Sequence, residues 1–198
     1  MFLGEIRVTD FDDDAAGRFR QQLLEHAVNY PNDPIRVYID SSGGELDSLN
    51  SMIATMQSVP NKIHTICLGK AYSCGAFLLS MGDIRSASPY ASIMIHEISA
   101  GTYGSTSEME NNLNEIKRQN KIWLTRFAKR CKKTYKQLQK IMRDNLNDDI
   151  FLSTKQAKDF GIIDRMHIPA PQYREIKHKI KEPPEPKEET LSSMFGEA

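Results

Sequence analysis

Two segments of this chain repeat one pattern: a run of β-branched residues, a turn that contains glycine, and an apolar helical stretch. The first segment leads from IRVYI, residues 35–39, through DSSGG into a stretch with apolar residues at helical spacing: Leu46, Leu49, Ile53 and Met56. The second leads from KIHTICL through GKAYSCG into AFLLSMG, residues 62–82. Strand, turn and helix used twice in succession favour parallel strands joined by crossover helices. The repeat predicts an α/β fold built on a parallel sheet.

The rest of the chain supplies further elements. ASIMI, residues 91–95, predicts a third buried strand. A helical period follows from residue 105 to about 131, with one apolar stripe interrupted by Asn120: Leu113, Ile116, Trp123 and Phe127. A shorter helix follows near residues 135–142, and Ile150-Phe151-Leu152 predicts a segment anchored in the core. Ser153 and Gln156 form a capping box for a last helix, which we expect Gly161 to end in the left-handed conformation.

The composition excludes several classes of protein. Lys plus Arg and Asp plus Glu are both 26, so net charge gives no general attraction to nucleic acid or acidic lipid. The three cysteines are odd in number and lack metal-binding spacing, which indicates a reducing compartment without a disulfide framework. No apolar run approaches about 18 residues, and no basic segment opens the chain. We expect a cytoplasmic protein that needs no metal or cofactor and does not enter a membrane.

The chain divides into a folded domain and an extension. Residues 1–168 carry the periodic pattern, and at 198 residues the chain is long enough for one domain with a well-covered core. Residues 169–198 are rich in Pro, Glu and Lys. From about residue 181 the composition buries too little apolar area to order itself, so we predict disorder there.

One hydroxyl stands where the second strand gives way to its helix. Ser73 at this turn either caps the helix or serves as a nucleophile at the carboxyl edge of the sheet. A nucleophilic serine needs a base, and of the five histidines only His96 follows a buried strand. A histidine there can also be an ordinary surface residue. Asp148-Asp149 offers an acid, although spacing alone does not select either. Gly43-Gly44 could place a backbone N–H against an oxyanion.

Taken together, these motifs resemble ClpP, the proteolytic subunit of the Clp peptidases. The resemblance runs from Phe2 to Asp164 and rests on four motifs: YIDSSGG, GKAYSCGAFLL, SIMIH and DDIFLSTKQAKDFGIID. It implies a nucleophile, a general base and an orienting acid: Ser73, His96 and Asp149. It also implies an oxyanion hole from the N–H groups of Gly44 and Cys74. A substrate peptide would pair with the backbone at four further positions: Gly43, Gly101, Thr102 and Tyr103.

The resemblance carries expectations for fold and assembly as well. It implies a crotonase-like fold of repeated β-β-α units with a protruding strand-helix handle, here residues 98–131. Subunits of the family form stacked rings, so it implies a homo-oligomer that hydrolyses peptides or unfolded proteins inside a chamber. The chain starts at the family's first core strand, which argues against a Clp-type ATPase as partner. It could therefore be one of the ClpP-like proteases that tailed phages use in head maturation.

Two other functions remain open on the same residues. A crotonase-type acyl-CoA enzyme would use the backbone oxyanion hole but would not need the serine, histidine and aspartate. A catalytically silent structural subunit would need none of them. The basic stretch Lys117–Arg143 has eleven Lys or Arg and no acid. It is either a solvated or intersubunit face or a surface for an acidic partner or nucleic acid. The aromatic residues here lie on the apolar stripe, which argues against nucleic-acid binding.

Overall fold

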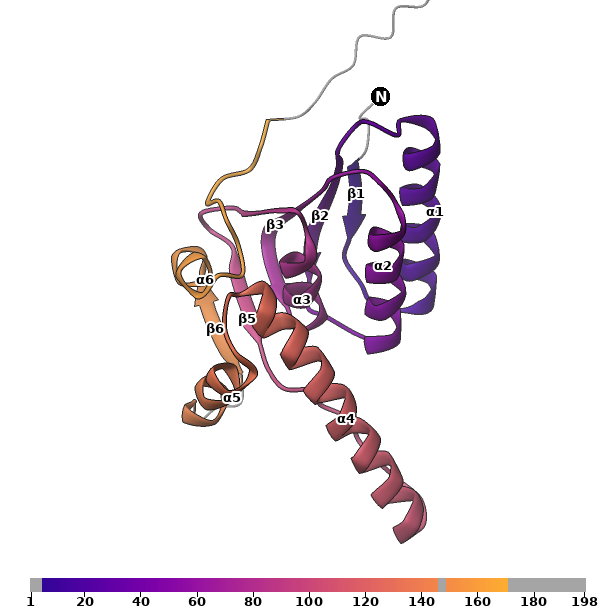
Figure 1. Cartoon of the computed structure of the whole chain (residues 1–198), viewed down its shortest axis with the longest axis vertical. Coiled ribbons are helices and arrows are strands. Elements are labelled where there is room, and N and C mark those ends of the chain that lie inside the picture. Colours follow the sequence, from indigo (N-terminus) through magenta and orange to yellow (C-terminus); the bar gives the residue numbers. More distant parts are fainter. Residues whose placement is uncertain (1–4, 146–148, 171–198) are drawn as a thin grey trace, which may run out of the picture.

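The computed structural model describes residues 5–145 and 149–170, and the predicted disordered extension falls on residues outside these ranges. Figure 1 shows the arrangement of the elements, in chain order. They are β1 (Glu5–Val8), α1 (Asp13–Asn29), β2 (Ile35–Ser41), α2 (Leu46–Ser58), β3 (Ile63–Tyr72), α3 (Cys74–Met81), β4 (Ile84–Ala87), β5 (Ser92–Ile95), α4 (Thr106–Arg130), α5 (Tyr135–Asp144), β6 (Ile150–Ser153) and α6 (Thr154–Phe160).

The sheet is parallel except at one edge. Its strands lie in the order β1-β2-β3-β5-β6, and β4 also pairs with β3. The long strand β3 carries β4 along its first half and β5 along its second half. Of the strands in the described part of the chain, only β6 runs antiparallel, beside β5. The prediction of a parallel sheet with crossover helices is confirmed, and β4 and the reversed edge strand are additions to it.

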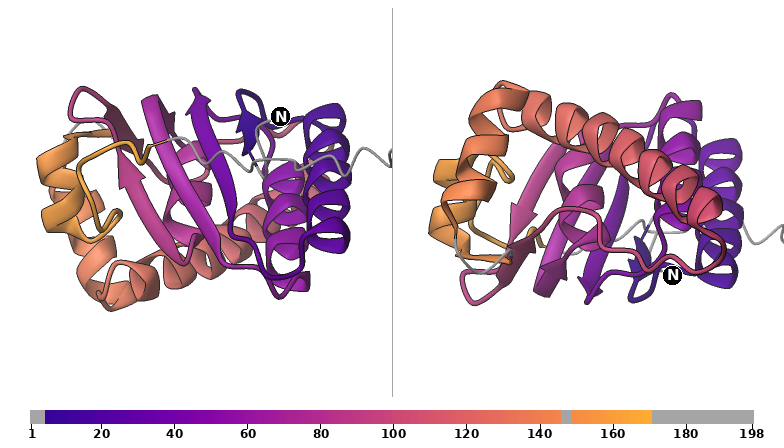
Figure 2. Two further views of the ribbon diagram at one scale, coloured as in Figure 1. Left: turned by 90° about the horizontal axis from the view of Figure 1, so that it is seen from above. Right: turned by 90° about the horizontal axis from the view of Figure 1, so that it is seen from below.

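Helix α3 packs on the sheet, α4 packs on α3, and α2 lies between α3 and α1 (Figure 2). The aromatic rings of Phe77, on α3, and Phe127, on α4, meet edge to face with their centroids 4.9 Å apart. Trp123 packs on Phe77 from the same side of α4, and all three residues are buried. The C-terminal half of α4 therefore belongs to the core. Within the described ranges no helix is long and apolar enough to cross a membrane.

The N-terminal half of α4 leaves the body of the molecule (Figure 1). Leu113 is 44 % exposed and Ile116 is half-buried, although both continue the stripe that buries Trp123 and Phe127. The expected helix is confirmed. Among the described residues the second half of its apolar stripe is buried, whereas Ile116 is only partly covered and Leu113 stays exposed. An apolar side chain left exposed on a helix face is the usual condition of a face that packs on another molecule.

The segment around Phe151 differs from the expectation of a core anchor. Because side chains alternate along a strand, only Leu152 of β6 is buried, whereas Phe151 is 58 % exposed and packs its ring against Tyr72. The end of the domain follows its prediction more closely. Ser153 and Gln156 form the capping box of α6, and Gly161 ends that helix with a φ of +96°.

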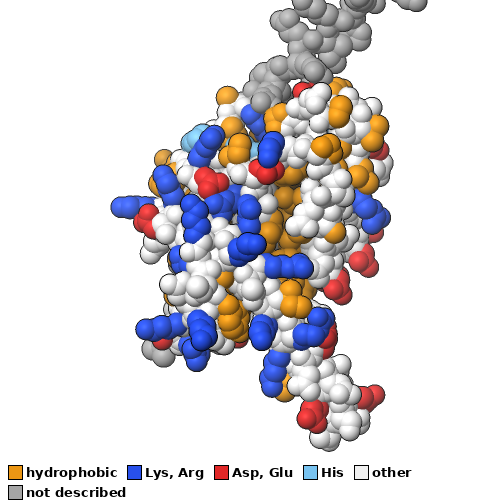
Figure 3. Space-filling view, viewed as in Figure 1, with side chains coloured by type: hydrophobic (Ala, Val, Ile, Leu, Met, Phe, Trp, Pro, Cys, Tyr) orange, Lys and Arg blue, Asp and Glu red, His pale blue; other side chains and the backbone are white. Residues whose placement is uncertain are grey.

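The basic stretch lies mostly at the surface, where Figure 3 shows Lys and Arg side chains over this face of the molecule. A few of its members are engaged within the chain. Arg118 pairs with Glu115, Lys133 donates to Phe160 O, and Arg130 donates to the carbonyls of Ser80 and Gly82. Its role as a solvated, intersubunit or partner-binding face stays a prediction.

Candidate active site

Ser73 occupies a strained turn between β3 and α3. Its backbone has a φ of +52°, a conformation that costs a residue with a side chain on the order of 1–3 kcal/mol. The turn is held by a hydrogen bond from Ser73 N to Met94 O, 2.9 Å long. Ser73 stands at the N-cap position of α3, but its hydroxyl makes no capping bond to that helix, so the interpretation of this hydroxyl as a satisfied helix cap is wrong. A strained strand-to-helix turn that presents a serine hydroxyl is typical of nucleophiles.

His96 lies where the sequence places a base. Its Nε2 is 2.6 Å from Ser73 Oγ, a hydrogen-bond distance. The two residues meet because β3 and β5 are parallel neighbours, paired at Tyr72 and Met94, so that both chains leave the sheet at the same edge. The His96 side chain is about one-fifth exposed and thus open to substrate.

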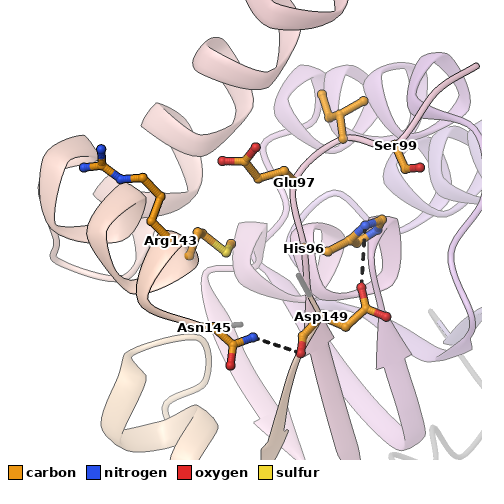
Figure 4. A pocket seen from close by; sticks show the side chains of 8 residues that line it. His96, Glu97, Ser99, Arg143, Asn145 and Asp149 are labelled. Atoms are coloured by element: carbon orange, nitrogen blue, oxygen red, sulfur yellow. Dashed lines mark hydrogen bonds and ion pairs between the residues drawn. The ribbon is translucent and has the colours of Figure 1, made fainter. Parts of the chain in front are cut away.

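Asp149 approaches the other nitrogen of this ring. Its Oδ1 lies 4.0 Å from His96 Nδ1, close enough for an ion pair but too long for a hydrogen bond (Figure 4). The antiparallel pairing of Ile95 with Ile150 brings it there, since it puts the residue before β6 beside the residue after β5. Asn145 Nδ2 donates to Asp149 O at 3.1 Å and so restrains the backbone. Asp148, the alternative acid, lies outside the described residues.

Two backbone N–H groups beside Ser73 are free to serve a ligand. Cys74 is the first residue of α3, so its N–H has no acceptor within the helix. No described backbone carbonyl accepts a hydrogen bond from Gly44 N. The turn that holds Gly44 lies against the serine: a Cβ on Gly43 would come 2.8 Å from Ser73 Cβ. Only glycine permits this contact at the Gly43 φ of +103°.

Two cavities flank the segment that follows His96. One of about 550 Å³ is shown in Figure 4. It is lined by His96, Glu97, Ile98, Ser99, Met142, Arg143, Asn145 and Asp149. The other, of about 410 Å³, opens beside Ser73, Gly44 and Cys74, and its walls include Leu46, Phe77, Ile98 and Ile116. The hydroxyl, the imidazole and the free N–H groups therefore border a cavity with an apolar wall, which suits a peptide side chain.

The three residues expected to pair with substrate lie farther along the same segment. The wall of the Ser73 cavity reaches Ala100 but does not include Gly101, Thr102 or Tyr103. Tyr103 is 91 % exposed, and Thr102 Oγ1 accepts a hydrogen bond from Asn112. Residues 96–104 form no strand. Their role in binding substrate stays a prediction, as does that of Gly43.

Asn120 belongs to the site although the sequence did not assign it a role. Its Oδ1 accepts a hydrogen bond from Ile98 N at 3.1 Å and ties the segment after His96 to α4. An amide that interrupts an apolar stripe was the available signal, because a half-buried polar group needs a partner. Asn145 gave no comparable signal, since its partner is a backbone carbonyl.

The chemistry of the site is that of polar side chains and backbone groups. Among the described residues no three His, Cys, Asp or Glu side chains cluster as metal ligands would. The nearby thiol of Cys74 is buried, and burial raises its pKa, which favours the protonated form over a nucleophilic thiolate. The hydroxyl of Ser73 is thus the better-placed nucleophile.

A comparison with protein families agrees with this geometry. The family model described as Clp protease matches residues 5–169, which include every residue of the site and the whole of the sheet. A match of this extent shows common ancestry across the folded part of the chain, so the protein belongs to the Clp protease family.

Proposed function

We propose that this chain is a serine endopeptidase in which Ser73 attacks the peptide bond, His96 acts as general base and Asp149 orients the imidazole. The observation that carries the proposal is the 2.6 Å contact between Ser73 Oγ and His96 Nε2, at a turn with free N–H groups. A crotonase-type acyl-CoA enzyme would have no use for this pair.

The geometry supports the following sequence of events. His96 Nε2 accepts the proton of Ser73 as Oγ attacks the substrate carbonyl, and it later passes that proton to the leaving amine. The carboxylate of Asp149 stabilises the imidazolium that forms in between. The 4.0 Å gap to Nδ1 must shorten for this, and such contacts often tighten only when substrate binds. The N–H groups of Gly44 and Cys74 stabilise the charge on the carbonyl oxygen.

The substrate we propose is a peptide or an unfolded protein, and the setting is an oligomeric chamber. A folded protein presents few segments that could reach a serine at the base of a cavity, whereas an extended chain can lie along residues 96–104 and place one side chain beside Leu46 and Phe77. We propose that the projecting half of α4 is the handle through which subunits of a crotonase-like superhelical fold assemble into rings. Its uncovered apolar side chains support this role.

A fluorophosphonate probe tests the proposed chemistry directly. The probe should label the wild-type protein at Ser73, as located by mass spectrometry, and Ser73→Ala should abolish both labelling and peptide hydrolysis. Ser99→Ala is the matched control, because Ser99 lines both cavities and is exposed. It should be labelled like the wild type. Labelling that persists in Ser73→Ala, or peptide hydrolysis within tenfold of the wild type, would contradict the assignment.

A further inference from the structure

Cys74, the residue after the proposed nucleophile, touches both halves of the proposed oxyanion hole. Its own N–H is one of the two donors. Its Sγ lies 3.2 Å from the carbonyl oxygen of Gly44 and donates a hydrogen bond to it. The side chain is buried, and burial raises the pKa of the thiol, so the thiol keeps the proton that it donates at neutral pH. A single side chain thus links the start of α3 to the turn that carries the other donor.

The peptide unit between Gly44 and Glu45 is held at both of its ends. Glu45 N donates to Phe11 O at 2.7 Å, and Gly44 O accepts the bond from Cys74. Gly44 also lies so close to Phe11 that a Cβ would stand 2.5 Å from its carbonyl oxygen. Of the two hydrogen bonds that hold this peptide unit, loss of the thiol would leave the one with Phe11.

The turn needs such a restraint because it is made of two consecutive glycines. Gly43 and Gly44 have φ values of +103° and +152°, and glycine has the greatest backbone freedom of any residue. The N–H and the carbonyl of Gly44 lie in adjacent peptide planes joined at its Cα, so once the carbonyl is fixed only the φ and ψ of Gly44 can change the direction of the N–H. An S–H···O bond adds little to stability. The rate of acyl transfer, in contrast, depends steeply on how oxyanion donors are aimed.

We propose that the Cys74 thiol is a positioning residue, which holds the Gly44 carbonyl and thereby keeps the Gly44 N–H directed at the substrate carbonyl oxygen as that oxygen gains charge. This inference rests on the proposed function, because it assigns a role within the same reaction. It predicts that removal of the S–H group affects the transition state more than the binding of substrate.

Three substitutions at one position test the role. Cys74→Ala and Cys74→Val remove the donor, the first with a smaller and the second with a larger side chain. Cys74→Ser keeps a donor. With a fluorogenic peptide, we expect kcat to fall about tenfold in the Ala and Val variants with KM within twofold, less than the roughly 10²–10³ for loss of a whole oxyanion donor. Cys74→Ser should recover most of kcat. A peptide aldehyde, whose adduct places an oxygen in the hole, should lose affinity in the same order.

Cys67→Ala provides the matched control, since Cys67 is also buried but lies within β3. It should keep the wild-type kcat even where its Tm falls as that of Cys74→Ala does. Wild-type kcat in Cys74→Val would overturn the positioning role while the peptidase assignment stands. An equal loss of kcat in Ala, Val and Ser would also overturn it, because the donor would then be irrelevant. A wild-type protein that neither hydrolyses peptides nor reacts with fluorophosphonate would overturn the proposed function and this role with it.

Discussion

Asp149 Oδ1 stands 4.0 Å from His96 Nδ1, whereas the opposite nitrogen of the same ring lies 2.6 Å from Ser73 Oγ. The base and the nucleophile are therefore already in contact, and the acid is about 1 Å short of a hydrogen bond. The Asp149 side chain is about half exposed. Its backbone, in contrast, is restrained by Asn145 and by β6. A side-chain rotation on a restrained backbone could close the gap when substrate excludes water from the site.

Asp149→Asn should lower kcat by about three to four powers of ten, because an amide can stabilise the wrong imidazole tautomer and cannot stabilise imidazolium. Asp148→Asn removes the same charge one residue earlier and serves as the control, with kcat expected within a few fold of the wild type. Steady-state peptide hydrolysis measures both. Equal losses in the two variants, or a larger loss at Asp148, would show that the acid has been assigned to the wrong residue.

Asn120→Leu should lower the activity, although it completes the apolar stripe of α4. The substitution removes the acceptor of the Ile98 N–H. It thereby releases the segment that leads from His96 to residues 101–103, which are predicted to pair with the substrate. We expect kcat/KM to fall by roughly tenfold, a cost of about 1.4 kcal/mol, with the Tm unchanged or raised. Asn120→Asp keeps an oxygen acceptor and should retain most of the activity. If the Leu and Asp variants hydrolyse peptides equally well, the hydrogen bond to Ile98 does not position the segment.

The free energy of unfolding should decrease as the pH falls from about 6.5 to about 4. Burial, aided by the cations of Arg36 and Arg165, lowers the pKa of His64 from 6.5 to about 4. Between pH 6.5 and 4, His64 therefore binds a proton in the unfolded chain but not in the folded chain. Acidification through this range should lower the free energy of unfolding by on the order of 3 kcal/mol relative to its value above pH 6.5. His64→Gln, which can still form a hydrogen bond with Ser86, should reduce this pH dependence of the free energy of unfolding, as measured by urea titrations. An unchanged slope in that variant would assign the acid sensitivity to other groups, such as His26, whose pKa burial also lowers.

Much of the site could be predicted from the sequence because it depends on strand order. Once two strand-turn-helix units predict parallel strands, residues that follow neighbouring strands must gather at one edge, and Ser73 and His96 do so. The choice of Asp149 depends instead on the register of the antiparallel strand β6, which no local pattern encodes. Strand β4 escaped prediction because its four residues, IRSA, have neither alternation nor β-branched enrichment beyond the first position.

The limits of periodicity are clearest in α4. The stripe from Leu113 to Phe127 has one period, yet its two ends differ in burial because the sheet and α3 lie under only the second half. The periodicity of a sequence indicates that one face of a helix is apolar, but it does not indicate what covers that face. Phe151 shows a related limit. Three consecutive apolar residues predict burial of all three, whereas a strand buries alternate residues and leaves Phe151 exposed.

Leu113→Asp should disrupt assembly without unfolding the subunit. Leu113 is 44 % exposed on the projecting half of α4, so a carboxylate there costs the single chain little but would be desolvated in a contact between subunits. Asn114→Asp adds the same charge at the exposed neighbouring position and is the control. Sedimentation velocity at micromolar concentration should show an oligomer for the wild type and Asn114→Asp, and mainly smaller species for Leu113→Asp with unchanged circular dichroism. Peptide hydrolysis should fall with the oligomer if the chamber sustains the active arrangement. A wild type that sediments as a monomer, or a Leu113→Asp variant that assembles as the wild type does, would show that this face of α4 is not the handle contact.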